Sequence, residues 1–239
     1  MRGFGTVINV LLIVAGGVLG ILVGKRFKER IRETLLTATG VAVLFLGIGG
    51  VVEKMITINA GSLKAGGTLM LILSIAVGSL IGEFINIDRG LTRFGEWLRE
   101  KSGSRGDNSF VDGFVSASCT VCIGAMAVVG SINDGISGDY SVLLAKGILD
   151  AIIVCIIAAA KGKGAIASAI PVLLLQGIMT VLAMILGSFI TPAALDNLSL
   201  VGSVLIFCVG INLVWDKKIR VANMLPSIVI AALMSLIPI

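Results

Sequence analysis

The stretch VINVLLIVAGGVLGILV, which is Val7–Val23, runs without a charged side chain. A helix needs about 17–25 predominantly apolar residues to cross the hydrocarbon core of a bilayer. A helix of a water-soluble protein keeps a polar outer face, and this stretch offers almost none. Arg2 is the only charged residue before this stretch, and Lys25 follows it in place of a small-residue cleavage site. We therefore expect a retained membrane-spanning helix rather than a signal peptide.

Seven further stretches are almost free of charge in the same way. They are Leu35–Val52, Gly67–Phe84, Phe110–Val129, Val142–Ala160, Ala165–Ile190, Leu198–Trp215 and Val221–Ile239. The whole chain is 56% hydrophobic and 14% charged, whereas soluble domains average about 45–50% and about 25%. The sequence therefore predicts an all-α polytopic membrane protein of eight spanning helices, which form one transmembrane domain over residues 1–239.

Basic residues are concentrated in every second connecting segment. They cluster in 25–32, 89–105, 161–163 and 217–220. Cytoplasmic loops of membrane proteins carry an excess of Lys and Arg, so these segments should face the cytoplasm and both termini the outside. The same rule accounts for the net charge of +5, which gives no reason to expect a nucleic-acid partner. We expect the protein in the bacterial cell (inner) membrane, surrounded by the lipid bilayer.

The segment Ile87–Lys101 has a different pattern. Apolar side chains recur at helical spacing with arginines among them, and Trp97 lies within the apolar set. This pattern is typical of an amphipathic helix lying in the membrane interface. The alternative is a soluble linker helix packed on another protein.

Small residues recur at every fourth position in several spans, for example at Gly16, Gly20 and Gly24. Such spacing lets helix backbones approach closely in lipid, and it also favours a homo-oligomer, which we expect to be a dimer. The end of the second span, Gly47–Lys54, resembles the end of the seventh, Gly210–Lys217. These spans should run in opposite directions, which predicts an inverted-topology repeat of the kind found in transporters.

The repeat divides the chain into four parts. They are a three-helix unit (1–86), the cytoplasmic amphipathic helix and loop (87–109), two central helices (110–164) and the inverted three-helix unit (165–239).

The run from Cys122 to Gly135 combines small residues, hydroxyls and an Asn-Asp-Gly turn signal at a span end. Backbone can leave helical geometry there, and at membrane depth this is tolerated only where it lines a cavity or is covered by protein. The run indicates either a wall of a transport pathway or an ordinary outer turn.

Four motifs give the chain a resemblance to a known family. They are GAMAVVGS at Gly124–Ser131, DG at Asp134, GD at Gly138 and KxxxD at Lys146. Together they resemble the signature of the bacterial YqgA/YdfK-like integral membrane proteins, a domain-of-unknown-function family. The resemblance covers nearly the full chain and implies a bacterial membrane protein, but it implies no activity.

Lys146 and Asp150 lie four residues apart, on one face of the fifth predicted span. A charge at the centre of a spanning helix costs about 2.5–3.5 kcal/mol on insertion scales, so such residues face a cavity or each other. The pair is either functional or a structural ion pair. The further candidates for a pathway are Asn133, Asp134, Ser116, Thr120, Gly124, Asn212 and Gln176.

The function that we expect is movement of a small solute or ion across the membrane, without an enzymatic reaction and without a cofactor. The chain has no histidine, which excludes imidazole metal sites and Ser-His-Asp triads. It has no P-loop either, so the driving force would be an ion gradient or none. One alternative is an intramembrane thiol oxidoreductase using Cys119 and Cys122. Two cysteines without histidine make a weak metal site, and inert packing is the simpler role for these thiols. A non-catalytic scaffold or regulatory subunit is the second alternative.

Reporter fusions test the orientation. We expect 25–32 and 89–105 in the cytoplasm and both termini outside, because basic segments are retained on the cytoplasmic side. A cytoplasmic C-terminus would contradict either the number of spans or their orientation.

Overall fold

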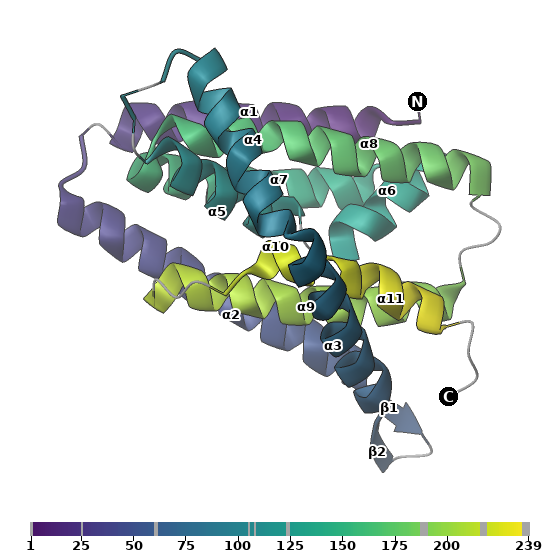
Figure 1. Cartoon of the computed structure of the whole chain (residues 1–239). Coiled ribbons are helices and arrows are strands. Elements are labelled where there is room, and N and C mark those ends of the chain that lie inside the picture. Colours follow the sequence, from purple (N-terminus) through teal and green to yellow (C-terminus); the bar gives the residue numbers. More distant parts are fainter. Residues whose placement is uncertain are drawn as a thin grey trace.

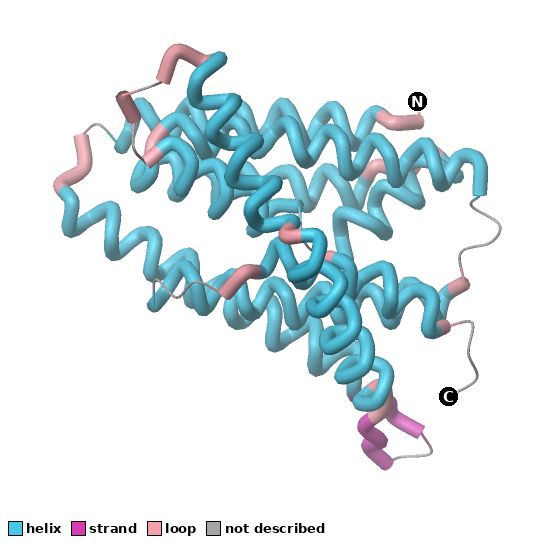
Figure 2. Tube along the Cα trace, in the orientation of Figure 1, coloured by secondary structure: helices cyan, strands magenta, loops and turns pink. Residues whose placement is uncertain are grey.

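The computed structural model describes residues 2–24, 26–59, 62–104, 106–107, 109–122, 125–186, 191–215 and 219–235. The elements in chain order are α1 (Phe4–Gly24), α2 (Glu29–Met55), β1 (Ile56–Asn59), β2 (Ser62–Ala65), α3 (Thr68–Ile85), α4 (Ile87–Lys101), α5 (Phe110–Cys122), α6 (Ala125–Ser137), α7 (Ser141–Lys161), the 3-10 helix η1 (Lys163–Ser168), α8 (Ala169–Leu186), α9 (Pro192–Trp215), α10 (Val221–Met224) and α11 (Pro226–Met234). The all-α membrane fold is confirmed, with one short hairpin added to it (Figures 1 and 2).

Six helical segments in the described residues are long and apolar enough to cross a membrane, and counting the bent pair α5–α6 as one span gives up to seven. The eighth predicted span, Val221–Ile239, contains α10 and the nine-residue α11, with Pro226 in the first turn of α11. Residues 236–239 lie outside the described part, so the count of eight stays a prediction.

The turn predicted from the Asn-Asp-Gly sequence is wrong. Asn133 and Asp134 lie within α6, which continues to Ser137.

The hairpin joins α2 to α3. Its strands are antiparallel, with Ile56 opposite Ala65 and Asn59 opposite Ser62. The described side chains of β2 are exposed. The β-branched residues of the ITIN segment favour an extended strand at the point where the apolar span ends.

The predicted amphipathic helix is confirmed as α4 (Ile87–Lys101). Asn86 begins it in the left-handed conformation, with φ 57°, and its side chain accepts a hydrogen bond from the Arg89 backbone N–H. Phe94 stacks on Trp97 and meets the ring of the buried Phe114 edge-on, with centroids 5.9 Å apart. Part of the apolar face of α4 therefore packs on α5 of the same chain.

The helices form two bundles (Figure 1). The first bundle contains α1, α5, α6, α7 and α8, and its apolar core includes Ile13, Val121 and Val154. The second bundle contains α2, α3, α9, α10 and α11, and its core includes Val43 and Leu205. A third, smaller core joins the two bundles, because Ile132 of α6 packs there with Leu198 of α9.

Close glycine contacts build the first bundle. A Cβ at Gly16, Gly20 or Gly24 would collide with the backbone of Ala151, Cys155 or Ala159. Residue numbers increase in the same direction along both helices at these contacts, so α1 and α7 run parallel with their backbones in contact. The predicted packing role of this glycine series is confirmed at these positions.

The second bundle pairs antiparallel helices. A Cβ at Gly40 would lie 2.7 Å from Val214 Cγ2, and a Cβ at Gly47 would lie 2.6 Å from the backbone nitrogen of Phe207. At the hairpin end, Lys54 Nζ lies 2.9 Å from Asp196 Oδ1, at the start of α9. The opposite directions of α2 and α9 are those that the inverted repeat requires. Superposition of the two repeat units stays a prediction.

Gly20→Ala tests the parallel seam. We expect the free energy of unfolding to fall by about 1–3 kcal/mol, because the added methyl group must push α1 away from the Cys155 carbonyl. Denaturation in mixed micelles measures the change. Gly177→Ala is the matched control, since a Cβ there has no neighbour within 4 Å among the described residues; equal losses in both variants would contradict the seam.

Candidate functional site

The fourth predicted span is a broken helix. The axes of α5 and α6 differ in direction by 60°. Gly113 lies beside Lys161 at the end of α7, and Gly130 lies beside Leu143 near the start of α7. The two helices therefore pass along α7 in one direction, and the last turn of α5 meets α7 at Lys146. Gly124, a predicted pathway residue, falls at the break and outside the described residues.

A buried ion pair lies next to the break. Lys146 and Asp150 are 5% and 4% exposed, and the Lys146 ammonium donates to Asp150 Oδ2. The same ammonium donates to the carbonyl oxygen of Val121 at 2.7 Å. Val121 belongs to the last turn of α5, where carbonyl groups lack intrahelical donors. Lys146 therefore caps the C-terminal end of α5, the end at which the helix dipole favours a cation.

Asn9 holds the carboxylate from the other side. Its side-chain Nδ2 donates to Asp150 Oδ2 at 3.2 Å, and the residue is fully buried on α1. No described residue donates a hydrogen bond to Asn9 Oδ1. The sequence analysis missed Asn9, although a polar residue within the apolar stretch Val7–Val23 was a usable signal.

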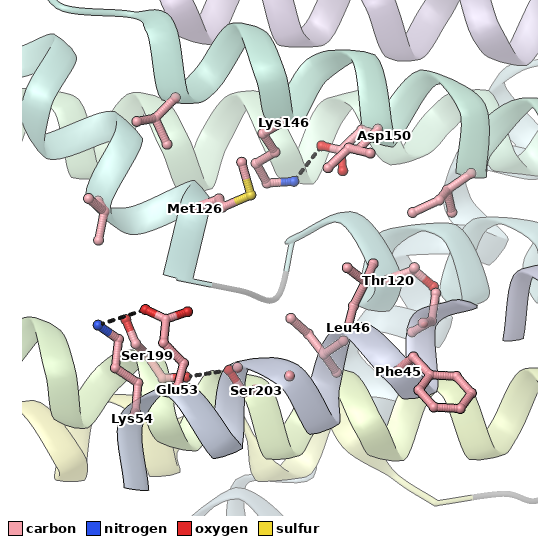
Figure 3. A pocket seen from close by; sticks show the side chains of 18 residues that line it. Phe45, Leu46, Glu53, Lys54, Thr120, Met126, Lys146, Asp150, Ser199 and Ser203 are labelled. Carbon is pink, nitrogen blue, oxygen red and sulfur yellow. Dashed lines mark hydrogen bonds and ion pairs between the residues drawn. The ribbon is translucent and has the colours of Figure 1, made fainter. Parts of the chain in front are cut away.

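The first cavity separates this pair from the second bundle and has a volume of about 560 Å³. Figure 3 shows Lys146 and Asp150 on one side, and Lys54, Ser199 and Ser203 on the other. Thr120 in the last turns of α5 also lines it. The cavity therefore reaches from the ion pair to the hairpin end of α2, where Lys54 bonds to α9.

A second cavity of about 430 Å³ lies at the opposite end of α9. Asp88, Asp112, Lys161 and Arg220 are the charged residues in its wall, and Ser116, Cys119 and Asn212 line it as well. Lys161 Nζ donates to Ser116 Oγ at 3.0 Å. Cys119 lines the second cavity and Thr120 the first, so the last turns of α5 separate the two spaces.

The remaining predicted residues have other surroundings. Asp134 is fully buried and accepts hydrogen bonds from the backbone N–H groups of Gly3 and Gly5, at 3.1 and 2.9 Å. It therefore caps the N-terminal end of α1. Asn133 and the buried Gln176 are not among the described residues that line either cavity; their roles in a pathway stay predictions.

Asn212 binds the backbone of Ile219, which precedes α10. Its side chain donates to the Ile219 carbonyl and accepts from the Ile219 N–H. The cysteines are free thiols, and Cys119 and Cys122 pack against the cores of different bundles.

These features define a polytopic α-helical membrane protein with a broken helix beside a buried ion pair. Over residues 4–236 the chain matches the family described as "Protein of unknown function (DUF554)", and it belongs to that family. The uncharacterized membrane protein YdfK of Bacillus subtilis (strain 168) is 29% identical over 227 residues, which cover 95% of this chain and 93% of YdfK. The uncharacterized protein YqgA of Escherichia coli (strain K12) is 29% identical over 231 residues, 95% of this chain and 94% of YqgA. No solved structure matches.

Asp134→Asn tests the cap on α1. One of the two acceptor oxygens becomes an NH₂ group that faces a backbone N–H, so we expect the free energy of unfolding to fall by about 1–2 kcal/mol. Asp139→Asn is the matched control, because Asp139 is exposed and water can replace its contacts with the backbone and the side chain of Ser141. Denaturation in mixed micelles should leave this control unchanged; an unchanged Asp134→Asn variant would remove the capping role.

Proposed function

We propose that the protein moves a small solute or an ion across the bacterial cell membrane, through a site beside Lys146 and Asp150. The observation that carries the proposal is the pair of cavities at opposite ends of α9, which stop on either side of the last turns of α5. Lys146 and Asp150 line the first of these cavities. A site that one cavity reaches, while a thin barrier closes it from the other, is what alternating access requires.

The broken helix supports the same function. Transporters use interrupted helices at the middle of the bilayer, because free backbone carbonyls and half-helix ends can bind ions there. In this chain the Val121 carbonyl meets the Lys146 ammonium. Buried ionisable groups of this kind are expensive in a membrane, and they are typical of ion routes and proton relays.

The two larger cores lie in different bundles, which supports a movement of one bundle against the other about the contact between α6 and α9. Val121 and Val154 belong to the first core, Leu205 to the second. Rigid bundles that rock about a fixed site would open the first cavity while closing the second. This activity needs no covalent chemistry, so the proposal includes that the protein is not an enzyme.

The proposal also places the protein in the membrane as the sequence suggests. The second cavity, with Asp88 and Arg220 in its wall, opens toward the cytoplasm, and the hairpin end of the first cavity opens to the outside. Both termini are then extracytoplasmic. Exposed apolar surface on α3, such as Leu80 and Phe84, faces lipid or a second copy in the proposed dimer.

Neutral replacements of the ion pair test the function. We expect Lys146→Met, Asp150→Asn and the double variant to insert and assemble as the wild type does, yet to lose at least about tenfold in flux, because an ion route depends on these charges. Ion and proton movement in reconstituted vesicles is the measurement. Misfolding of both single variants with recovery in the double variant would show a structural ion pair and contradict the proposal.

A cysteine control separates transport from thiol chemistry. The double variant Cys119→Ser with Cys122→Ser should keep its flux, because neither thiol is required by the proposed route. Loss of flux in this variant with normal assembly would favour the thiol alternative.

A further inference from the structure

The two cavities share a pattern of charge. The described residues that line the first cavity include two acidic and two basic side chains, which are Glu53, Lys54, Lys146 and Asp150. The described wall of the second cavity again contains two of each sign. A lone ion would bring a net charge into an interior where such a charge is expensive, and neither wall has an excess of the opposite sign to offset it. The pattern favours a solute whose own charges sum to zero.

The charged groups at the outer ends of the cavities already have partners. Lys54 pairs with Glu53 and with Asp196, and Arg220 pairs with Glu83. These side chains are partly or largely exposed, so water screens their charges. The buried pair beside the last turns of α5 is therefore the stronger place to hold the charged groups of a solute.

The buried pair has hydrogen-bonding capacity left. An ammonium group has three N–H donors, and that of Lys146 uses them for the Val121 carbonyl and for Asp150 Oδ2. The bonds that Asp150 accepts from Lys146 and Asn9 both end on Oδ2. Figure 3 shows Lys146 and Asp150 side by side in the α7 wall of the first cavity. Among the described residues nothing else engages the remaining N–H of the cation or Oδ1 of the anion, so both are left for a ligand.

The rest of this wall is mainly apolar and has room. Gly49 lies on the same face of α2 as Leu46 and Glu53, and a Cβ at Gly49 would meet no described atom within 4 Å. The volume of about 560 Å³ lies in the range of about 300–1,000 Å³ that is typical of small-molecule sites. The large apolar side chains of the wall include Leu46, Met126, Val129, Leu149, Ile153 and Ile206.

We propose that the first cavity binds an α-amino acid with an apolar side chain. The carboxylate of this solute accepts from the Lys146 ammonium, its own ammonium group donates to Asp150, and its side chain lies against the apolar wall. The proposal rests on the proposed function and names its substrate class. An α-amino acid carries both charged groups on one carbon atom, which matches a cation and an anion that are themselves hydrogen-bonded. Two charge-assisted contacts then form, and the charges of site and solute sum to zero.

Binding is measured as the thermal midpoint of the purified protein in detergent at about pH 7, with leucine as the probe. We expect a gain of about 3–6 °C at saturating leucine, because a ligand of the folded state stabilises that state. A wild type without this gain overturns the proposal.

Matched analogues test the need for both charges. Isocaproate is leucine without the ammonium group, and isoamylamine is leucine without the carboxylate. Leucyl-leucine keeps both charges but holds them far apart. Each of the three should need at least about tenfold more ligand than leucine for half of its gain. An analogue that binds as tightly as leucine overturns the proposal.

Variants of the pair should reverse the preference among these ligands. Lys146→Met should bind isoamylamine more tightly than leucine, because the amine supplies the missing cation to Asp150. Asp150→Asn should prefer isocaproate for the corresponding reason. Lys163→Met is the control, at an exposed lysine that is not among the described residues of either wall, and it should keep the wild-type preference. A preference for leucine that survives in both pair variants places the head group elsewhere and overturns the proposal.

Gly49→Phe tests the apolar part of the cavity without touching the pair. The new side chain takes up space, so half of the gain should need at least about tenfold more phenylalanine than in the wild type, and less than about threefold more alanine. Gly177→Phe is the matched control, because a Cβ there also meets no described atom within 4 Å and Gly177 is not among the described residues of either wall. An unchanged ratio of phenylalanine to alanine in Gly49→Phe overturns the proposal.

Binding in detergent requires no transport, so the two proposals fail separately. A gain with leucine, but no uptake of labelled leucine and no ion or proton movement in vesicles, would keep the amino-acid site and remove the transporter. Ion movement that depends on Lys146, without any gain from leucine, would keep the transporter and remove the amino-acid site.

Discussion

A helix that ends within a membrane leaves carbonyl groups in a medium without water, and each unpaired group costs several kcal/mol. Here the helix is α5, and the Lys146 ammonium donates to the carbonyl of Val121. An ammonium buried alone would be costlier still, and Asp150 supplies the opposite charge one turn further along α7. Asn9 then orients the carboxylate. The break, the cation and the anion are therefore one unit, and the surrounding helices are arranged to hold it.

The glycine seam makes this unit possible. Asn9 reaches Asp150 because the backbones of α1 and α7 touch along the glycine series that contains Gly16 and Gly20. Side chains at these positions would move α1 outward and take Asn9 with it. The ion pair faces the second bundle across the first cavity, so one side of the pair is fixed by close packing and the other side borders open space.

The sequence predicted the class of fold, most helix positions and the ion pair, because each depends on local composition. Apolar length gave the spans, and the spacing of Lys146 and Asp150 placed them on one face. It also indicated that backbone could leave helical geometry near Gly124, where α5 and α6 are interrupted. It could not show that Asp134 caps α1, since that bond joins residues 129–131 positions apart. Asn9 was visible in the sequence as a polar residue in an apolar stretch, but its partner Asp150 is known only once folding brings the two together.

The parallel arrangement of α1 and α7 has a consequence for the order of synthesis. Asn9 and Asp150 are separated by 141 positions in the chain, and a ribosome adds about 5–20 residues per second. The first helix is therefore made about 7–28 s before the helix that accepts its amide. During this interval the Asn9 side chain must be sheltered by the insertion machinery or by the headgroup region, because hydrocarbon offers it no partner. Biogenesis of this protein is thus a delayed assembly, in which the earliest helix waits for a late one before the membrane domain can close.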